Sequence, residues 1–207
     1  AAPFEAFVPQ ADDGPKCDLC HDDEWIFILA SGRSGSTSIL AMLNAIPGFY
    51  VAGENYAQIM DLMEAYGHAS DTAAKDDSLP FFHNEIELED LLCDLQQYTR
   101  DMIGAYDTET THAIGFTEIR ITTTAEMDFM RTLFPCGKFI MNWRTDVEAQ
   151  QNSAFHKRDG VTAEQLEAVN QRMEQWSDVH SGWAYKLPCC DDFTIETFNG
   201  LLAWLGV

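Results

Sequence analysis

A nearly continuous apolar run that leads directly into a turn of small residues places the strongest constraint on the fold. The run covers residues 24–30, and its length and its β-branched and aromatic content predict a strand buried on both faces, as in a parallel sheet. The turn covers residues 31–37, and apolar residues at helical spacing follow it until Pro47 and Gly48. A buried strand, a tight turn and a helix in this order are typical of an α/β domain.

The rest of the chain continues this alternation of strands and helices. Further strands are predicted over residues 49–52, 113–120, 138–143 and 183–187. Helices are predicted over residues 56–66, 86–103, 123–134, 146–157, 166–176 and 195–206, with a polar loop over 67–80. The pattern favours a three-layer α/β/α fold with a mostly parallel sheet of about five strands. We expect residues 1–23 to be an irregular leader and residues 24–207 to form a single α/β domain.

Polar and charged side chains follow several of the predicted strands at the point where each strand ends. The turn 31–37, Glu54, Glu118, Arg120 and Arg144 all occupy such positions. Ligands of parallel sheets bind beyond the carboxyl ends of the strands. These segments are therefore expected to meet in one site.

The turn has the composition of an anion-binding loop. Its glycines permit a tight backbone path, its hydroxyls and backbone N–H groups can donate, and Arg33 adds a permanent positive charge. An ordinary strand-to-helix turn, with Ser36 or Thr37 as a helix cap, is the alternative. The nucleotide-triphosphate signature GxxxxGK[ST] is absent because no lysine precedes Ser36 or Thr37, which argues against kinases and ATPases.

The charge of the chain limits its partners. The formal charge is -22, from 34 acidic and 12 basic residues, and a field of this sign repels nucleic acid and anionic membrane surfaces. No apolar run reaches the ~18 residues that a membrane span needs, so membrane insertion is not expected. A soluble protein is expected, with the cytoplasm favoured over the Golgi lumen. The oligomeric state is not predicted.

Six cysteines are too few for a disulfide scaffold at this length. Cys93 and Cys136 lie in apolar surroundings and are expected in the core. Cys17 and Cys20 have the spacing of a haem-attachment motif or of half a zinc site. A local disulfide or free thiols are expected there instead, and no metal site is predicted.

Residues 28–40, ILASGRSGSTSIL, resemble the 5′-phosphosulfate loop of sulfotransferases that use 3′-phosphoadenosine 5′-phosphosulfate (PAPS). The match is to the arginine form, RSGST, of carbohydrate-type and bacterial members. Residues 139–144, FIMNWR, resemble the second motif of that family, a strand ending in an arginine that binds the 3′-phosphate with a partner about eight residues later. Residues 198–206 resemble the final helix of the family.

The resemblance implies a P-loop-like phosphosulfate loop, PAPS as donor, the product PAP, and no metal. It implies that Arg33 stabilises charge on the 5′-phosphate and the bridging oxygen. Arg144 and either Asn152 or Ser153 would bind the 3′-phosphate. The implied nucleotide-binding residues are Ser31, Gly32, Arg33, Ser34, Gly35, Ser36, Thr37, Arg144, Asn152 and Ser153.

A base for the acceptor is expected at one of two carboxylates. Glu54 matches a position where several carbohydrate-type members carry a catalytic carboxylate, Glu118 is its rival, and Arg120 is a candidate to hold substrate or to lower the pKa of Glu118. The acidic chain favours a small neutral or cationic acceptor over a polyanion. A non-catalytic PAP-binding module, an atypical P-loop kinase and a c-type haem carrier are the competing interpretations.

Overall fold

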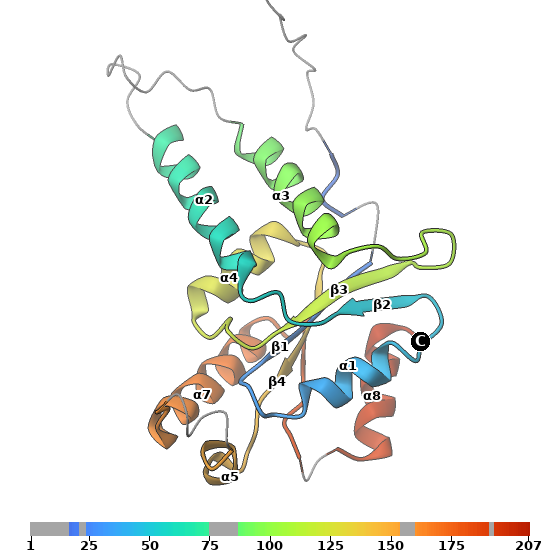
Figure 1. The fold of residues 1–207 in the computed structure, drawn as a ribbon, viewed down its shortest axis with the longest axis vertical. Coiled ribbons are helices and arrows are strands. Elements are labelled where there is room, and N and C mark those ends of the chain that lie inside the picture. Colours follow the sequence, from blue (N-terminus) through green and yellow to red (C-terminus); the bar gives the residue numbers. More distant parts are fainter. Residues whose placement is uncertain (1–16, 21–23, 75–86, 154–159, 191–192) are drawn as a thin grey trace, which may run out of the picture.

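The structure is a computed structural model that describes residues 17–20, 24–74, 87–153, 160–190 and 193–207. A five-stranded sheet forms its centre, in the order β2-β3-β1-β4-β5 (Figure 1). Every pair of neighbouring strands is parallel. The strands are β1 (Glu24–Ala30), β2 (Phe49–Ala52), β3 (Ala113–Glu118), β4 (Lys138–Asn142) and β5 (Ala184–Lys186). The predicted sheet is thus confirmed, and it is parallel throughout its described strands.

Helices cover both faces of the sheet. They are α1 (Ser36–Leu43), α2 (Gln58–Ala73), α3 (Leu88–Ile103), α4 (Thr124–Leu133), α5 (Val147–Gln151), α7 (Ala163–Val179) and α8 (Ile195–Leu205). Alternate residues of β1 separate two buried clusters, with Ile26 and Ile28 packed against α1 and α8. Phe27 and Leu29 pack against α2, α3, α4 and α7. Figure 1 shows α1 beside α8, apart from the helices of the other layer. The three-layer prediction is therefore confirmed.

Two helix ends differ most from the sequence-based prediction. The polar segment predicted as a loop over 67–80 begins as helix, because α2 continues to Ala73; residues 75–80 lie outside the described part. The helix capped by Asp146 ends at Gln151 instead of near residue 157. The cap itself is present, since the Asp146 carboxylate accepts a 2.8 Å hydrogen bond from the Ala149 N–H. Residues 154–159 lie outside the described part.

The cysteines are paired across the chain, which corrects the expectation of a local disulfide or free thiols. Cys17 is bonded to Cys93 and Cys20 to Cys136, with sequence separations of 76 and 116. The segment before β1 is thereby tied to α3 and to the turn between α4 and β4. Most of the predicted leader over 1–23 lies outside the described residues.

The two remaining cysteines, Cys189 and Cys190, are bonded to each other. With every thiol committed to a disulfide, none is left for a haem thioether. Among the helices that the structure describes, none combines the length and apolarity required to cross a bilayer.

Candidate functional site

The loop between β1 and α1 follows a backbone path that is rare for L-amino acids. Gly32, Arg33 and Gly35 have φ angles of 68°, 56° and 85°. The left-handed conformation at Gly35 favours glycine, and a Cβ there would lie 3.1 Å from the ring of Phe193, which would have to move to admit it. Non-glycine residues in this region cost about 1–3 kcal/mol and cluster at ligand sites. The strained turn at Arg33 is consistent with a binding loop.

Side chains from β4 and α5 hold this loop in position. The Ser31 N–H donates to the Asn142 carbonyl at 3.0 Å, and the Ser34 hydroxyl donates to the Asn142 side-chain oxygen at 2.5 Å. The Gln150 amide nitrogen, which is fully buried, lies 2.9 Å from the Ser31 carbonyl and 2.7 Å from the Gly32 carbonyl. The loop is therefore preorganised by contacts that join segments more than a hundred residues apart.

The start of α1 offers donors to an anion. Gly35 is the N-cap residue and has no side chain with which to cap the helix, and the first turn carries no acidic residue. The backbone N–H groups of a first helical turn lack intrahelical partners and lie at the positive end of the helix dipole. Ser36 and Thr37 add hydroxyls at the same place. This end of α1 is suited to a phosphate or sulfate group.

Arg144 lies directly beside the loop. One of its terminal nitrogens, Nη1, is 3.5 Å from the Arg33 carbonyl oxygen, and its own carbonyl accepts a 2.8 Å hydrogen bond from the Asn170 side chain. Arg144 Nε and the Ser153 hydroxyl are buried, and neither has a hydrogen-bond partner within the described residues. Asn152 is exposed at the end of α5. Of the two candidate partners of Arg144, Ser153 therefore has the buried and unpartnered side chain, and Asn152 has the exposed one.

Glu118 is fully buried, and both of its carboxylate oxygens are engaged. Oε1 accepts hydrogen bonds from the backbone N–H groups of Ile119 and Arg120, at 2.9 and 3.1 Å, and from the Arg120 guanidinium at 3.0 Å. Oε2 accepts from the Ala57 N–H at 2.9 Å. A carboxylate committed in this way holds the ends of β2 and β3 together. It is a weaker candidate for a base than Glu54.

Glu54 and Arg120 form a half-exposed ion pair at the rim of the sheet. Their side chains are 40% and 37% exposed, and Arg120 Nη1 lies 3.0 Å from Glu54 Oε2. Burial of the guanidinium opposes its charge, but hydrogen bonds and charge from Glu118 and Glu54 outweigh this effect and raise the pKa of Arg120. The Arg120 guanidinium also lies 5.3 Å from the centre of the Tyr56 ring. Arg120 therefore stays charged and orients the Glu54 carboxylate.

The loop between β1 and α1, Glu54 and Glu118 all lie at the carboxyl ends of neighbouring strands. Glu118 is in register with Leu29, two residues before Ser31, and Phe116 is in register with Ala52, two residues before Glu54. The strands therefore bring together the residues that the sequence analysis assigned to one site. Within the described part of the chain, no group of His, Cys, Asp and Glu side chains is arranged to hold a metal ion.

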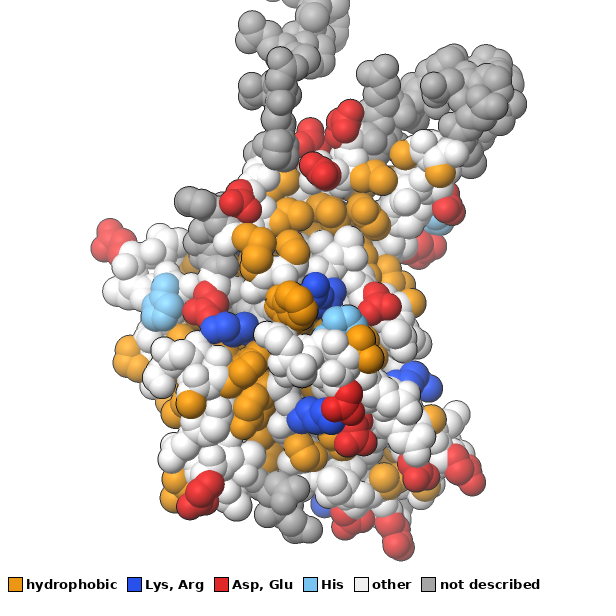
Figure 2. Space-filling model, turned by 180° about the vertical axis from the view of Figure 1, so that it is seen from behind, with side chains coloured by type: hydrophobic (Ala, Val, Ile, Leu, Met, Phe, Trp, Pro, Cys, Tyr) orange, Lys and Arg blue, Asp and Glu red, His pale blue; other side chains and the backbone are white. Residues whose placement is uncertain are grey.

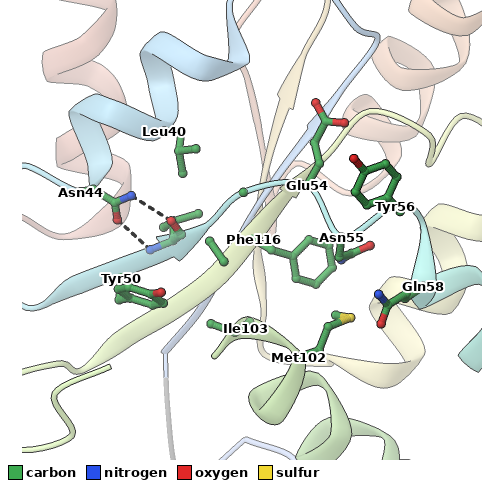
Figure 3. A pocket seen from close by; sticks show the side chains of 13 residues that line it. Leu40, Asn44, Tyr50, Glu54, Asn55, Tyr56, Gln58, Met102, Ile103 and Phe116 are labelled. Carbon is green, nitrogen blue, oxygen red and sulfur yellow. Dashed lines mark hydrogen bonds between the residues drawn. The ribbon is translucent and has the colours of Figure 1, made fainter. Parts of the chain in front are cut away.

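Two cavities flank α1. One, of about 230 Å³, lies between α1 and α8 and is lined by Ser38, Leu187 and Phe193, among others. The other, of about 560 Å³, lies along β2 and reaches Glu54 (Figure 3). We call the first the α8 slot and the second the β2 groove. Both cavities are lined in part by residues of α1 or its C-terminal end.

Some residues of this site were not identified from the sequence. Gln150, Asn142 and Asn170 hold the loop and Arg144 through side-chain contacts. One signal was present, because Asn142 is a polar residue that directly follows the apolar run 139–141 at the end of β4. The local sequence around Gln150 and Asn170 does not mark them as site residues, because polar residues are common in helices and their partners lie far away in the chain.

A comparison with known families identifies the family of the chain. A family model described as the sulfotransferase family matches residues 25–187, which is most of the chain. A search of curated proteins found no match. The matched region contains the loop, both carboxylates, Arg144 and Ser153. The chain belongs to the sulfotransferase family.

Proposed function

We propose that this protein transfers a sulfuryl group from PAPS to a hydroxyl or amine of a small acceptor that is neutral or cationic. One observation carries the proposal: Arg144 Nε and the Ser153 hydroxyl are buried donors without a partner in the described residues. A buried donor without a partner costs about 1–3 kcal/mol. A 3′-phosphate that accepts from both donors would remove this cost.

The loop residues bind the other end of the nucleotide in this proposal. The N–H groups and hydroxyls at the start of α1 surround the 5′-phosphosulfate, and Gly32 and Gly35 let the backbone approach it. Arg33, exposed at the loop, neutralises charge on the bridging oxygen. Ser31 and Ser34 are buried and bonded to Gln150 and Asn142, so they support the loop.

The α8 slot is a suitable place for the adenine. It is mostly apolar, and it is lined by Ser38 in the first turns of α1 and by Phe193, whose ring is next to Gly35. A flat, apolar base packs well against an aromatic side chain. In this proposal the 5′-phosphosulfate, the 3′-phosphate and the adenine each bind at a site of suitable chemistry.

Transfer breaks the bond between sulfur and the bridging oxygen, forms a bond between sulfur and the acceptor, and releases PAP and the acceptor's proton. We assign acceptance of this proton to Glu54, because it is half-exposed and Arg120 contacts only its Oε2 among the described residues. Glu118 keeps the base and Arg120 in place. Arg120 orients Glu54 and is near enough to the β2 groove to contact substrate.

The charge of the protein supports a neutral or cationic acceptor. Acidic side chains are spread over the face seen in Figure 2, and the whole chain carries a formal charge of -22. Such a field slows the approach of a polyanion. A strongly anionic polysaccharide is therefore a poor candidate.

The disulfides lead us to propose a different compartment from the one that the sequence favoured. Cytoplasmic proteins rarely contain stable disulfides, whereas lumenal and extracellular proteins commonly do. All six cysteines of this protein are paired. We therefore favour an oxidising compartment over the cytoplasm.

Two assays test the proposed function together. Sulfation is followed with PAPS and a panel of small phenols, alcohols and amines, while PAP binding is measured by calorimetry. A transferase binds PAP and turns over, with turnover reduced at least a hundredfold in Glu54→Gln. A non-catalytic binding module binds PAP without any transfer, and an atypical kinase consumes ATP in the presence of Mg²⁺ instead. Either of these results would contradict the proposal.

A further inference from the structure

The chain that leaves β2 reaches α2 through two residues in a left-handed conformation. Tyr56 and Ala57 have φ angles of 58° and 62°, which residues with a Cβ rarely adopt. Ala57 is also the N-cap residue of α2, and its side chain makes no capping hydrogen bond. Residues held in this region destabilise the free chain, persist only where their surroundings fix them, and cluster at ligand sites. The connection therefore has a shape that its own sequence does not favour.

The buried carboxylate of Glu118 fixes this shape. Its Oε2 accepts the 2.9 Å hydrogen bond from the Ala57 N–H, and its Oε1 accepts from the backbone and the guanidinium of Arg120. The carbon of the Arg120 guanidinium lies 5.3 Å from the centre of the Tyr56 ring. Arg120 Nη1 lies 3.0 Å from Glu54 Oε2. One buried group thus holds the turn at Tyr56 and, through Arg120, the carboxylate of Glu54.

This arrangement leaves the Tyr56 side chain in solvent. Tyr56 is 83% exposed, and no other large apolar or aromatic side chain in the described part of the chain is as exposed. Its hydroxyl forms no hydrogen bond to another described residue. Figure 3 shows Tyr56 following Glu54 on the chain that leaves β2. An exposed phenol on a strained backbone, held by the same arginine as a candidate base, is placed to contact a ligand.

Polar side chains gather at this end of the β2 groove. Glu54, Tyr56 and Gln58 are exposed and line it, and Asn55 lies among them. The nitrogen and oxygen of the Asn55 amide are buried and lack a hydrogen-bond partner in the described residues. In Figure 3 these four residues lie toward one end of the pocket, and Asn44 lies at the other. A carboxylate, a phenol hydroxyl and two amides in one place favour a ligand with more than one polar group.

We propose that Tyr56 is an acceptor-binding residue, which makes the protein selective for acceptors that carry a second hydroxyl or amine next to the one that reacts. The reacting group reaches Glu54, and the Tyr56 hydroxyl forms a hydrogen bond to the second group. An acceptor with a single polar group leaves this hydroxyl to water and gains no hydrogen bond from it. The inference rests on the proposed function, because it takes Glu54 as the base.

Two pairs of probes with the same ring test the selectivity. Cyclohexanol is compared with trans-1,2-cyclohexanediol, and cyclohexylamine with trans-2-aminocyclohexanol, so that each pair differs by one hydroxyl. Binding to the full chain with PAP bound is measured by ligand-observed NMR. We expect the second member of each pair to bind about fivefold more tightly, which is the effect of one hydrogen bond. Equal or tighter binding of the first member in both pairs would overturn the selectivity.

Substitutions at Tyr56 test whether this residue is the cause. Tyr56→Phe removes the hydroxyl and keeps the ring, so the advantage of the second probe should fall below twofold in each pair. Tyr56→Gly should have the same effect. Ala57→Gly is the matched control, because it also places glycine at a left-handed position but keeps the phenol, and it should retain the fivefold advantage. PAP affinity, measured by calorimetry, should be the same in all three variants.

The possible failures lead to different conclusions. An advantage that survives in Tyr56→Phe would assign the selectivity to another residue, and an advantage that is lost in Ala57→Gly would assign it to the shape of the turn. Either result would overturn the role of the Tyr56 hydroxyl while leaving the nucleotide site intact. Absence of PAP binding to the unaltered protein would instead overturn the proposed function, and the role of Tyr56 with it.

Discussion

The side-chain nitrogen of Gln150 lies 2.7 Å from the backbone carbonyl of Gly32, although the two residues are 118 positions apart in the chain. The same nitrogen is 2.9 Å from the Ser31 carbonyl. Gln150 is fully buried on α5, and Gly32 belongs to the loop after β1. This contact joins the two segments to which we assign opposite ends of the nucleotide. It keeps the loop in its left-handed conformation before any ligand arrives.

Loss of this contact should affect both stability and nucleotide binding. Gln150→Ala leaves two buried carbonyls without this donor, so we expect a loss of about 1–3 kcal/mol in the free energy of unfolding. PAP affinity should fall about tenfold because the loop is less well ordered. Gln151→Ala is the control, since the one side-chain hydrogen bond of Gln151 to the described residues is a 3.4 Å contact with the Val161 carbonyl. Urea unfolding and calorimetry measure the two effects, and equal results for both variants would contradict this role of Gln150.

Substitution of Glu118 and substitution of Glu54 should lower the free energy of unfolding by different amounts. Glu118→Gln removes the charge of a fully buried group and places an NH₂ where oxygens now accept. We expect it to lower the free energy of unfolding by about 2–4 kcal/mol, less than for a fully buried ion pair because Arg120 is partly exposed. Glu54→Gln alters a half-exposed ion pair and should cost less than about 1 kcal/mol. A large loss of stability in Glu54→Gln, measured by urea unfolding, would show that Glu54 is mainly structural.

Arg120 should contribute nothing to the pH dependence of turnover or of stability at the pH values at which an enzyme is assayed. Burial lowers the pKa of Arg120, but hydrogen bonds and charge from Glu118 and Glu54 outweigh burial, so that the pKa is raised. A base with a raised pKa contributes stability below its ordinary pKa and loses it only as the pH rises through the folded value. For an arginine that window lies above about pH 12, so Arg120 is charged at every pH of interest.

The two long-range disulfides should stabilise the fold. The bonds from Cys17 to Cys93 and from Cys20 to Cys136 close loops of 76 and 116 residues. We expect the removal of either bond by a double Cys→Ser change to cost about 2–4 kcal/mol. Urea unfolding measures the loss, and mass spectrometry of peptides under non-reducing conditions tests the pairing. Recovery of Cys17 linked to Cys20 would contradict it.

Much of the fold could be predicted because buried parallel strands have continuous apolar sequences. The runs at residues 24–30, 49–52 and 138–143 each became a strand within one residue of the expected bounds. The end of α2 was missed because residues 67–73 are polar and exposed, so no apolar stripe marks them as helical. The pairing of six cysteines has 15 solutions, and spacing alone does not choose among them.

The site could be predicted only in part. Arg33, Glu54 and Arg144 stand at strand ends, and parallel strands bring such ends to one edge whatever the details of packing. The contacts of Gln150 and Glu118 were not predictable, because they depend on which side chains meet across the fold. Glu118 is buried whereas Glu54 is half-exposed, and the Ser153 hydroxyl is buried whereas Asn152 is exposed. These differences in burial distinguish the candidates, and they arise only when the chain folds.

A calorimetric titration of PAP tests the central claim most directly. Arg144→Ala should lose about 1.5–3 kcal/mol of binding free energy, roughly 10- to 100-fold in affinity, and Ser153→Ala should lose about half of that. Arg131→Ala is the control, because it also removes a cation. Arg131 packs over Trp183, which directly precedes β5 and therefore lies at the amino ends of the strands, away from the site at their carboxyl ends. We predict tight binding to the unaltered protein and to Arg131→Ala. No binding to the unaltered protein, or equal affinity in Arg144→Ala, would contradict the account.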